Sequence, residues 1–257
     1  MTFYKAIISY IGSDYFGWQV QPNARTIQGE VNKALAVINQ CQLSEIKTMG
    51  SGRTDAGVHA INQVVKIEMP LNIPCDGLKK ALNSHLPKEI RVEEVEPSHE
   101  DFHPVRDAKI KEYKYFFTVG EDLRGPHLVQ TVSHFRGNID VKLMKKGAKH
   151  FIGKHDFQNF RTVGTDVSST IREIYSLEIT SQVIEFQRVA PLEVYCLTVK
   201  GEGFLKQMVR LIVGTLINYA QCKITDEQIT EHLSAKKEDK LGPVAPAEGL
   251  FLYNVTY

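Results

Sequence analysis

The segment GFLKQMVRLIVGTLINYA, residues 203–220, most constrains how this chain folds. A helix drawn over about 204–220 is apolar on nearly every side, so it is expected to be buried in a core. Arg210 interrupts this helix, and a buried guanidinium needs a partner because an unpaired buried charge is very costly. Asp55 is one candidate partner. A structural ion pair elsewhere, or an arginine that reaches water at the helix edge, are the alternatives.

Composition is that of an ordinary soluble protein, with 42% apolar and 24% charged residues in a chain of 257. No apolar run approaches the length of about 18 residues that spans a membrane. The first ten residues lack a basic stretch followed by an apolar one, so no secretory signal is expected. The four cysteines form no C-x-x-C pair and are expected to be buried or idle thiols in a reducing cytoplasm.

Strand and helix patterns alternate along the chain. Residues 112–119 alternate as a strand does, and Thr225 and Gln228 form a capping-box pattern before a helix. The expected strands cover 4–10, 62–69, 91–96, 112–119, 170–179, 192–200 and 250–257. The expected helices cover 26–40, 76–86, 140–152, 204–220 and 225–235.

The domain organisation is expected to be two halves, 1–104 and 105–257, with the boundary near His103 and Pro104. Each half contributes strands and helices, which predicts the α+β class with helices packed on one face of a sheet. A cleft between two such halves would suit a long ligand.

The charge distribution leaves a nucleic-acid partner open. The net charge is only +1, but residues 101–160 carry 11 basic and 7 acidic side chains. A local basic surface binds phosphates even on a neutral protein. An uneven but ordinary solvated surface accounts for the same numbers equally well.

Several cofactor motifs are absent from the sequence. There is no phosphate-binding P-loop, Gly201-Glu202-Gly203 lacks the third glycine of a dinucleotide site, and the nine histidines show no metal-ligand spacing. No G-x-S-x-G elbow occurs. The chemistry is therefore expected to need no metal, nucleotide or organic cofactor.

The most unusual local sequence is GSGRTDAGVHA, residues 50–60, in which glycines bracket Arg53 and Asp55. Glycines allow a ligand to approach the backbone closely, and a positioned carboxylate acts as a nucleophile or general base. An aspartate that only forms an Asx turn is the commoner explanation of such a loop.

Tyr113 and Tyr115 point to one face of the strand expected over 112–119. An aromatic side chain that faces a cleft stacks on a nucleic-acid base. Core packing is the alternative for both tyrosines and is the favoured one for Tyr115.

Seven blocks of the sequence, taken together, resemble the TruA-type tRNA pseudouridine synthase family. GRTDAGVHA resembles the family's active-site loop, and the other blocks follow in the family's order over essentially the whole chain. They are YIGSDYFGWQVQPNARTIQGEV (10–31), ALNSHLP (81–87), FHPVRDAKIKEYKY (102–115), FIGKHDFQNFR (151–161), GFLKQMVRLIVGTL (203–216) and APAEGLFLYNVTY (245–257).

The resemblance implies a role for each candidate site residue. Asp55 matches the catalytic aspartate, Tyr113 the tyrosine that stacks on the target uracil, and Arg210 the basic residue that pairs with the aspartate. Arg53 and Thr54 belong to the same loop and are expected to bind substrate. Basic residues are expected to grip phosphates, namely Lys109, Lys111, Lys114, Lys142, Lys145, Lys146 and Lys149.

The resemblance also implies a fold, a partner and a reaction. Two ferredoxin-like halves are expected to form a continuous, mainly antiparallel sheet with helices on one face and a central active-site cleft. The protein is expected to be a cytoplasmic homodimer that converts uridines 38, 39 and 40 in the anticodon arm of tRNA to pseudouridine. That reaction is an isomerisation within one nucleotide, so it needs no ATP, metal or redox partner.

Three alternatives to this interpretation as a tRNA pseudouridine synthase of the anticodon arm remain. The first keeps the chemistry and changes the RNA site. The second is a non-catalytic RNA-binding module, which the presence of Asp55, Tyr113 and Arg210 together disfavours. The third is a phosphatase-like hydrolase with an aspartate nucleophile, disfavoured because no D-x-D pair accompanies Asp55 to hold magnesium.

Overall fold

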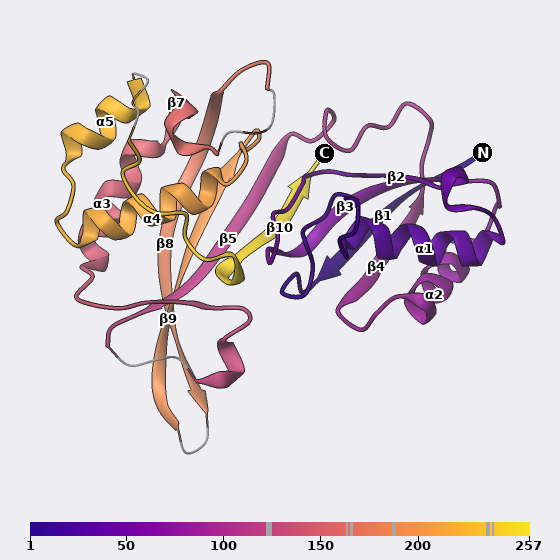
Figure 1. Ribbon diagram of the computed structural model, residues 1–257, viewed down its shortest axis with the longest axis horizontal. Helices are drawn as coiled ribbons and strands as arrows, with labels where there is room; N and C mark the ends of the chain where they lie inside the picture. Colours follow the sequence, from indigo (N-terminus) through magenta and orange to yellow (C-terminus); the bar gives the residue numbers. More distant parts are fainter. Residues whose placement is uncertain (122–124, 163, 165–166, 187–188, 235–236, 238) are drawn as a thin grey trace. The chain divides into compact units, whose positions relative to one another are not determined.

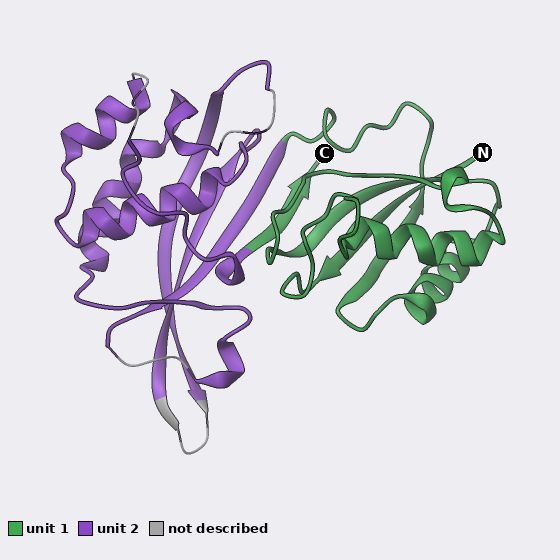
Figure 2. Ribbon diagram, viewed as in Figure 1, with its two compact units in different colours: residues 1–109, 251–257 green, residues 110–250 purple. Residues whose placement is uncertain are grey.

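The computed structural model describes residues 1–121, 125–162, 164, 167–186, 189–234, 237 and 239–257. These residues form two compact units, one of 1–109 with 251–257 and one of 110–250 (Figures 1 and 2). The expected division after residue 104 stays a prediction, and the two units meet between residues 109 and 110. The last strand differs from expectation, because Phe251 and Leu252 pair with His59 and Ala60 and so place the chain's end in unit 1.

Unit 1 is a mainly antiparallel sheet with two helices. The first strand, β1, lies between β3 and β4, and β2 pairs with β3. The parallel pairing in this unit joins β10 to β3. The strands are β1 (Thr2–Tyr10), β2 (Lys47–Gly50), β3 (His59–Met69), β4 (Ile90–Pro97) and β10 (Leu250–Thr256), and the helices are α1 (Ile27–Asn39) and α2 (Cys75–His85).

One face of the unit 1 sheet is covered. Alternate residues of β1 are buried, from Tyr4 to Tyr10, as the period of two in a half-covered strand requires. Helix α1 buries its apolar stripe and begins at the expected cap, where Thr26 Oγ1 accepts a hydrogen bond from Gly29 N at 3.2 Å. It ends at Gln40, which adopts a left-handed conformation with φ 51°.

The described residues of unit 2 repeat this plan with three α-helices, of 8, 13 and 9 residues. Its sheet runs β5-β9-β8-β7 with antiparallel pairing, and β6 pairs with β5 in parallel. The strands are β5 (Ile110–Val119), β6 (Ser133–Phe135), β7 (Gly153–Asp156), β8 (Ile171–Phe186) and β9 (Val189–Gly201), and the helices are α3 (Val141–Ala148), α4 (Met208–Ala220) and α5 (Asp226–Ser234).

Helix α4 forms the centre of the unit 2 core, as its apolar sequence predicts. All of its residues are buried except Arg210 and Asn218, which are half-buried. The helix begins at Met208 and not near residue 204, because Gln207 takes the left-handed conformation with φ 60°. At its middle, a Cβ on Gly214 would lie 1.8 Å from Pro243 O, so the segment after α5 packs directly on the helix backbone.

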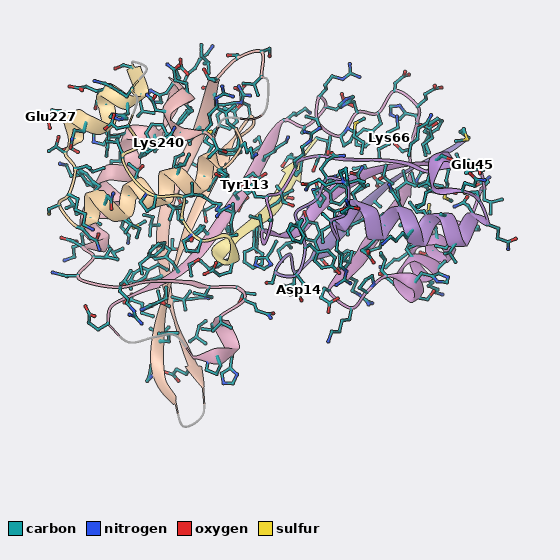
Figure 3. The ribbon with its side chains drawn as sticks, viewed as in Figure 1. Asp14, Glu45, Lys66, Tyr113, Glu227 and Lys240 are labelled. Carbon is teal, nitrogen blue, oxygen red and sulfur yellow. The ribbon has the colours of Figure 1, made fainter. Side chains whose placement is uncertain are left out.

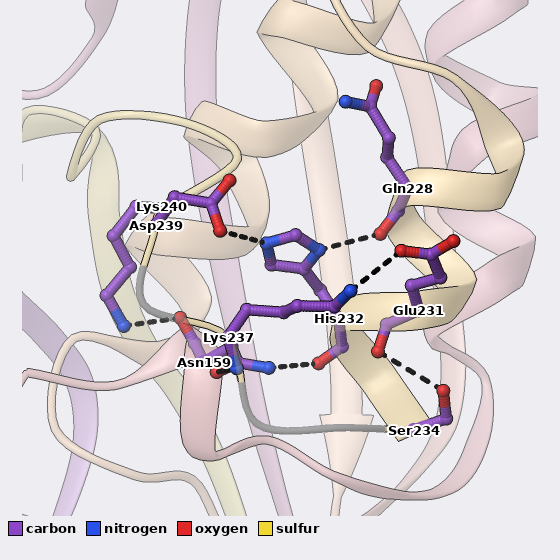
Figure 4. A network of polar contacts seen from close by, with 8 residues as sticks. All are labelled: Asn159, Gln228, Glu231, His232, Ser234, Lys237, Asp239 and Lys240. Carbon is purple, nitrogen blue, oxygen red and sulfur yellow. Dashed lines mark hydrogen bonds and ion pairs between the residues drawn. The ribbon is translucent and has the colours of Figure 1, made fainter.

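The residues after α5 are tied back to the body of unit 2 (Figure 4). Asn159 Nδ2 donates to His232 O at 2.7 Å, and Asn159 Oδ1 accepts from Lys237 N at 3.0 Å. Lys240 Nζ donates to Asn159 O at 2.6 Å and to Arg161 O at 3.1 Å. These bonds hold Lys237 and Lys240 against Asn159 and Arg161.

The α+β class and the mainly antiparallel pairing are confirmed. The helix expected over 140–152 is shorter, because α3 ends at Ala148, one 3-10 turn follows, and Gly153 opens β7 with φ 104°. The cleft expected between the halves stays a prediction. Among the described residues, no helix has both the length and the apolar character needed to cross a membrane.

Candidate active-site residues

Asp55 lies in the loop between β2 and β3, residues 51–58, in unit 1. Its side chain is half-buried, while Arg53 beside it is exposed and Thr54 is buried at 7%. Val58 N donates to Asp55 O at 3.1 Å, which closes a turn over the aspartate. Gly57 completes the turn with φ 79°, a conformation that favours glycine.

A second loop, residues 11–26, packs against this one. Trp18 N donates to Thr54 O at 3.1 Å, and Gly57 N donates to Tyr15 O at 3.2 Å. Gly17 has φ 87°, and a Cβ there would lie 2.4 Å from Thr54 O. A side chain at residue 17 would therefore push the two loops apart.

A buried polar network lies beneath the loop. Gln63 of β3 is fully buried, donates from Nε2 to Gly52 O at 2.6 Å, and accepts from Gly52 N at 3.2 Å. Ser51 Oγ donates to the same Gln63 Oε1 at 2.7 Å. The hydroxyls of Tyr10 and Thr54 lie 2.9 Å apart. Burial raises the pKa of Tyr10 far above its ordinary value, so this phenol stays neutral.

The C-terminal end of the same loop is also fixed. His59 is fully buried, and its Nδ1 accepts a hydrogen bond from Gly12 N at 2.9 Å. Its ring stacks on Phe251 with centroids 4.5 Å apart. A Cβ on Gly12 would lie 2.0 Å from Val58 O, so the two backbones are in direct contact.

Tyr113 lies on β5 in unit 2 (Figure 3). It is 8% exposed, and its ring meets Phe204 edge to face with centroids 5.1 Å apart. Tyr115, two residues on, is a core residue as predicted: it is fully buried, its hydroxyl donates to Pro246 O at 2.9 Å, and Ser133 Oγ lies 2.8 Å from the same hydroxyl.

Lys111 precedes Tyr113 on the same buried face of β5. Burial, with a smaller effect from the Arg172 guanidinium, lowers the pKa of Lys111 to about 8. Among the basic residues expected to grip phosphates, Lys111 is thus a buried amine. Lys146 is exposed but pairs with Asp226 at 2.6 Å.

Arg210 lies in the first turn of α4 and is half-buried. Its Nε donates to Ala245 O at 2.6 Å, and Ala245 N donates back to Arg210 O at 3.1 Å. This exchange fixes the plane of the guanidinium. The sequence predicts a buried arginine, and the structure leaves it half-buried because the helix begins only two residues earlier.

The structure groups the predicted site residues by unit. Arg53, Thr54 and Asp55 share one loop of unit 1, and Tyr113 and Arg210 belong to unit 2. The pairing of Asp55 with Arg210 stays a prediction, because the two residues belong to different units. Within the described ranges, no three His, Cys, Asp or Glu side chains gather as metal ligands would.

Sequence reasoning missed Tyr10 and Gln63, and it named Lys111 only as one of several lysines on a basic surface. One pattern would have indicated Gln63 and the burial of Lys111. Gln63 shares the buried register of β3 with Val65 and Ile67, and Lys111 shares that of β5 with aromatic residues. A polar residue in a buried apolar register requires partners, and such residues often serve a site.

Comparison with known proteins gives the family. Residues 6–105 and 148–257 match the family model described as tRNA pseudouridine synthase. The protein named tRNA pseudouridine synthase A of Bacillus subtilis (strain 168) is 39% identical over 255 residues, which cover 98% of each chain. The protein of that name from Listeria welshimeri serovar 6b is 37% identical over 258 residues, which cover 100% of each chain.

A third relative, tRNA pseudouridine synthase A of Brevibacillus brevis, is 37% identical over 256 residues, covering 98% of each chain. These matches extend over both units of the fold. They confirm the family resemblance and the expected enzyme class, an isomerase that acts on RNA. The chain belongs to the tRNA pseudouridine synthase family.

Proposed function

We propose that this enzyme converts uridines 38, 39 and 40 in the anticodon arm of tRNA to pseudouridine, with Asp55 as the catalytic carboxylate. The observation that carries the proposal is the construction of the Asp55 loop. A fully buried glutamine bonds both polar atoms of the Gly52 backbone, and two glycines bring the neighbouring loop into direct contact. A loop built this rigidly holds a carboxylate in one orientation.

The reaction balances without a second reactant. The N1–C1′ bond of the uridine breaks, the uracil turns, and a C5–C1′ bond forms. The C5 proton leaves to solvent, and N1 ends with a proton. One carboxylate is sufficient: Asp55 either adds covalently and is later displaced, or removes a ribose proton and returns it. Both routes release the base from C1′ and rejoin it through C5.

Tyr113 and Arg210 serve the same reaction in the proposal. Tyr113 stacks on the flipped uracil, and its edge-to-face contact with Phe204 supports this by limiting rotation of the ring. Arg210 pairs with Asp55 and keeps the carboxylate ionised. The hydrogen bond from its Nε to Ala245 O supports this role because it orients the guanidinium.

Arg53 and the exposed lysines contact the RNA in this proposal. Arg53 is exposed on the catalytic loop, where it meets the nucleotides around the target. Lys109, Lys142, Lys145 and Lys149 are exposed and contact phosphates. The enzyme acts in the cytoplasm as a homodimer, so that one tRNA touches both subunits.

The experiment is tritium release from tRNA transcripts labelled at C5 of uridine. Wild type is compared with Asp55→Asn, and each of uridines 38, 39 and 40 is replaced in turn. Release is expected from wild type alone and falls with each replacement. Asp76→Asn, in the first turn of α2, is the matched control and keeps full activity.

The other outcomes separate the alternatives. Release that survives all three replacements keeps the chemistry and moves the target to another RNA site. Equal release by Asp55→Asn and wild type removes Asp55 from the mechanism. RNA binding without release from any transcript identifies a binding module.

A further inference from the structure

We propose that Tyr10 and Gln63 are positioning residues for the catalytic loop, with Thr54 as the link to Asp55. The inference rests on the proposed function of Asp55. All four residues belong to unit 1, and the hydrogen bonds that join Tyr10, Thr54 and Gln63 are buried. Tyr10, Gln63 and Thr54 are uncharged, and their role in the proposal is to fix the position of the Asp55 carboxylate.

Gln63 acts on the backbone at the start of the loop. Its carboxamide takes the place of a neighbouring strand, since Nε2 bonds Gly52 O at 2.6 Å and Oε1 bonds Gly52 N at 3.2 Å. Ser51 Oγ is a second donor to Oε1, at 2.7 Å. If the amide were reversed, its NH2 group would face the donors Gly52 N and Ser51 Oγ, so the carboxamide has one orientation. Residue 52 is thereby fixed at both of its polar backbone atoms.

Tyr10 acts on the loop one step closer to Asp55. Its hydroxyl lies 2.9 Å from Thr54 Oγ1 and 3.4 Å from Gln63 Nε2. Thr54 is held from the other side by Trp18 N, which donates to Thr54 O. The residue before Asp55 is thus fixed by its side chain and by its carbonyl, which leaves the aspartate little freedom.

The network's location argues for more than packing. Tyr10 is 3% exposed and Gln63 0%, and apolar residues of similar shape would fill this core without needing hydrogen-bond partners. Buried polar groups are costly unless every one is satisfied, and satisfied ones define a single arrangement. A displacement of about 1 Å in a catalytic group lowers rates by about 100-fold. A network that holds the catalytic loop in one arrangement is therefore expected to raise the rate of the reaction.

Tyr4 provides a matched control within the same strand. It lies on the same face of β1, is 2% exposed, and donates from its hydroxyl to Ile73 O at 2.8 Å. Its contacts are with the segment before α2, so its hydroxyl supports the fold without touching the loop. Tyr4→Phe and Tyr10→Phe delete the same atom from the same kind of environment.

The experiment is a double-mutant cycle on kcat for tritium release, using Tyr10→Phe, Thr54→Val and the double variant. Each single variant is expected to lower kcat about tenfold or more with the KM for tRNA within about twofold. The double variant is expected to be no slower than the worse single variant, because both remove one interaction. Thr54→Ser keeps the hydroxyl and recovers most of the rate lost in Thr54→Val.

Gln63→Glu tests the other half of the network. Glutamate keeps the acceptor for Gly52 N but places an oxygen next to Gly52 O, so we expect kcat to fall. Gln63→Met removes both hydrogen bonds and measures their combined effect on kcat. Amide hydrogen exchange at Trp18 N is expected to quicken in Tyr10→Phe and Gln63→Met and to stay unchanged in Tyr4→Phe. This readout reports the loop directly and does not need activity.

Two results overturn the proposal. The first is a kcat in Tyr10→Phe equal to that of Tyr4→Phe, with unchanged exchange at Trp18. The second is strict additivity in the cycle, which would make the two hydroxyls independent. Failure of the proposed function is distinguishable, because wild type itself would then release no tritium, or Asp55→Asn would match it.

Discussion

Arg210 and Ala245 bond each other twice: Arg210 Nε donates to Ala245 O at 2.6 Å, and Ala245 N donates to Arg210 O at 3.1 Å. The first bond uses the side chain and the second the backbone. Together they join the first turn of α4 to the segment that leads to β10. The orientation of the guanidinium therefore depends on a segment 35 residues away in sequence.

Arg210→Lys separates charge from orientation. Lysine keeps the positive charge but has no Nε–H and no planar fork, so the contact with Ala245 O is lost. We expect kcat to fall about tenfold or more and the free energy of unfolding to fall by about 1 kcal/mol. Arg91→Lys, at an exposed position of β4, is the control and should change neither quantity. An active, fully stable Arg210→Lys enzyme would show that charge alone matters.

Gly214→Ala tests whether the segment before β10 must lie flush on α4. A Cβ at residue 214 would lie 1.8 Å from Pro243 O, a backbone atom that has to move. We expect the free energy of unfolding to fall by about 1 to 3 kcal/mol and kcat to fall with it, because Ala245 follows Pro243 toward Arg210. Denaturant unfolding and tritium release measure the two effects.

Gly77→Ala is the matched control, since it is also a glycine inside a helix. A Cβ there would lie 3.5 Å from Ile73 Cγ2, which is ordinary contact. Alanine is the better helix former, so this variant should be more stable than wild type by about 0.5 to 1 kcal/mol. Equal effects at residues 77 and 214 would contradict the argument from close packing.

Local patterns were sufficient to predict most of the elements. The alternation over 4–10 and 112–119 gives β1 and β5, and the Thr225–Gln228 capping box opens α5 with reciprocal bonds of 2.9 and 3.4 Å. The short strands β2, β6 and β7 were missed. They span only three or four residues, and pairing with a neighbouring strand stabilises them more than their own sequence does.

The site was predictable only in part, because its support is non-local. The loop with Arg53, Thr54 and Asp55 stands out in sequence through its glycines. Its contacts with Tyr10 and Gln63 join residues 44 and 11 positions apart and become visible only once β1 and β3 pair. The start of α4 was misplaced for a similar reason, since nothing local marks Gln207 as left-handed.

Lys111 should make the free energy of unfolding depend on pH in the alkaline range. Burial lowers its pKa from 10.5 to about 8 in the folded protein, so between these values the unfolded chain binds more protons than the folded one. The free energy of unfolding of wild type should therefore rise with pH across this window, relative to Lys111→Met. We expect the difference between the two to change by about 1 to 3 kcal/mol from pH 7 to pH 10.

Lys200→Met serves as the comparison for Lys111. Its side chain is 45% exposed on the neighbouring strand β9 and pairs with Glu112 at 3.5 Å. Lys200→Met controls for the loss of one lysine side chain from the same sheet. A difference between wild type and Lys111→Met that does not change with pH would show that the Lys111 amine titrates as in the unfolded chain.

Asp226 should make the free energy of unfolding depend on pH in the acidic range. Its carboxylate lies 2.6 Å from Lys146 Nζ, 2.7 Å from His150 Nε2 and 2.5 Å from Tyr219 Oη, so it joins α5 to α3, α4 and the turn between α3 and β7. Hydrogen bonds from Lys146, then Tyr219 and His150, lower the pKa of Asp226 well below its ordinary value of 3.8.

A lowered carboxyl pKa stabilises the folded state above the ordinary value, and this contribution is lost as the pH falls through the folded-state pKa. Asp226→Asn should therefore unfold at a lower denaturant concentration than wild type at pH 7, and the two should converge as the pH falls from about 5 toward 2. Glu45→Gln, at an exposed site of unit 1, is the control for the loss of one surface carboxylate. A gap between wild type and Asp226→Asn that persists undiminished at pH 2 would show that the loss came from packing and not from the ionised carboxylate.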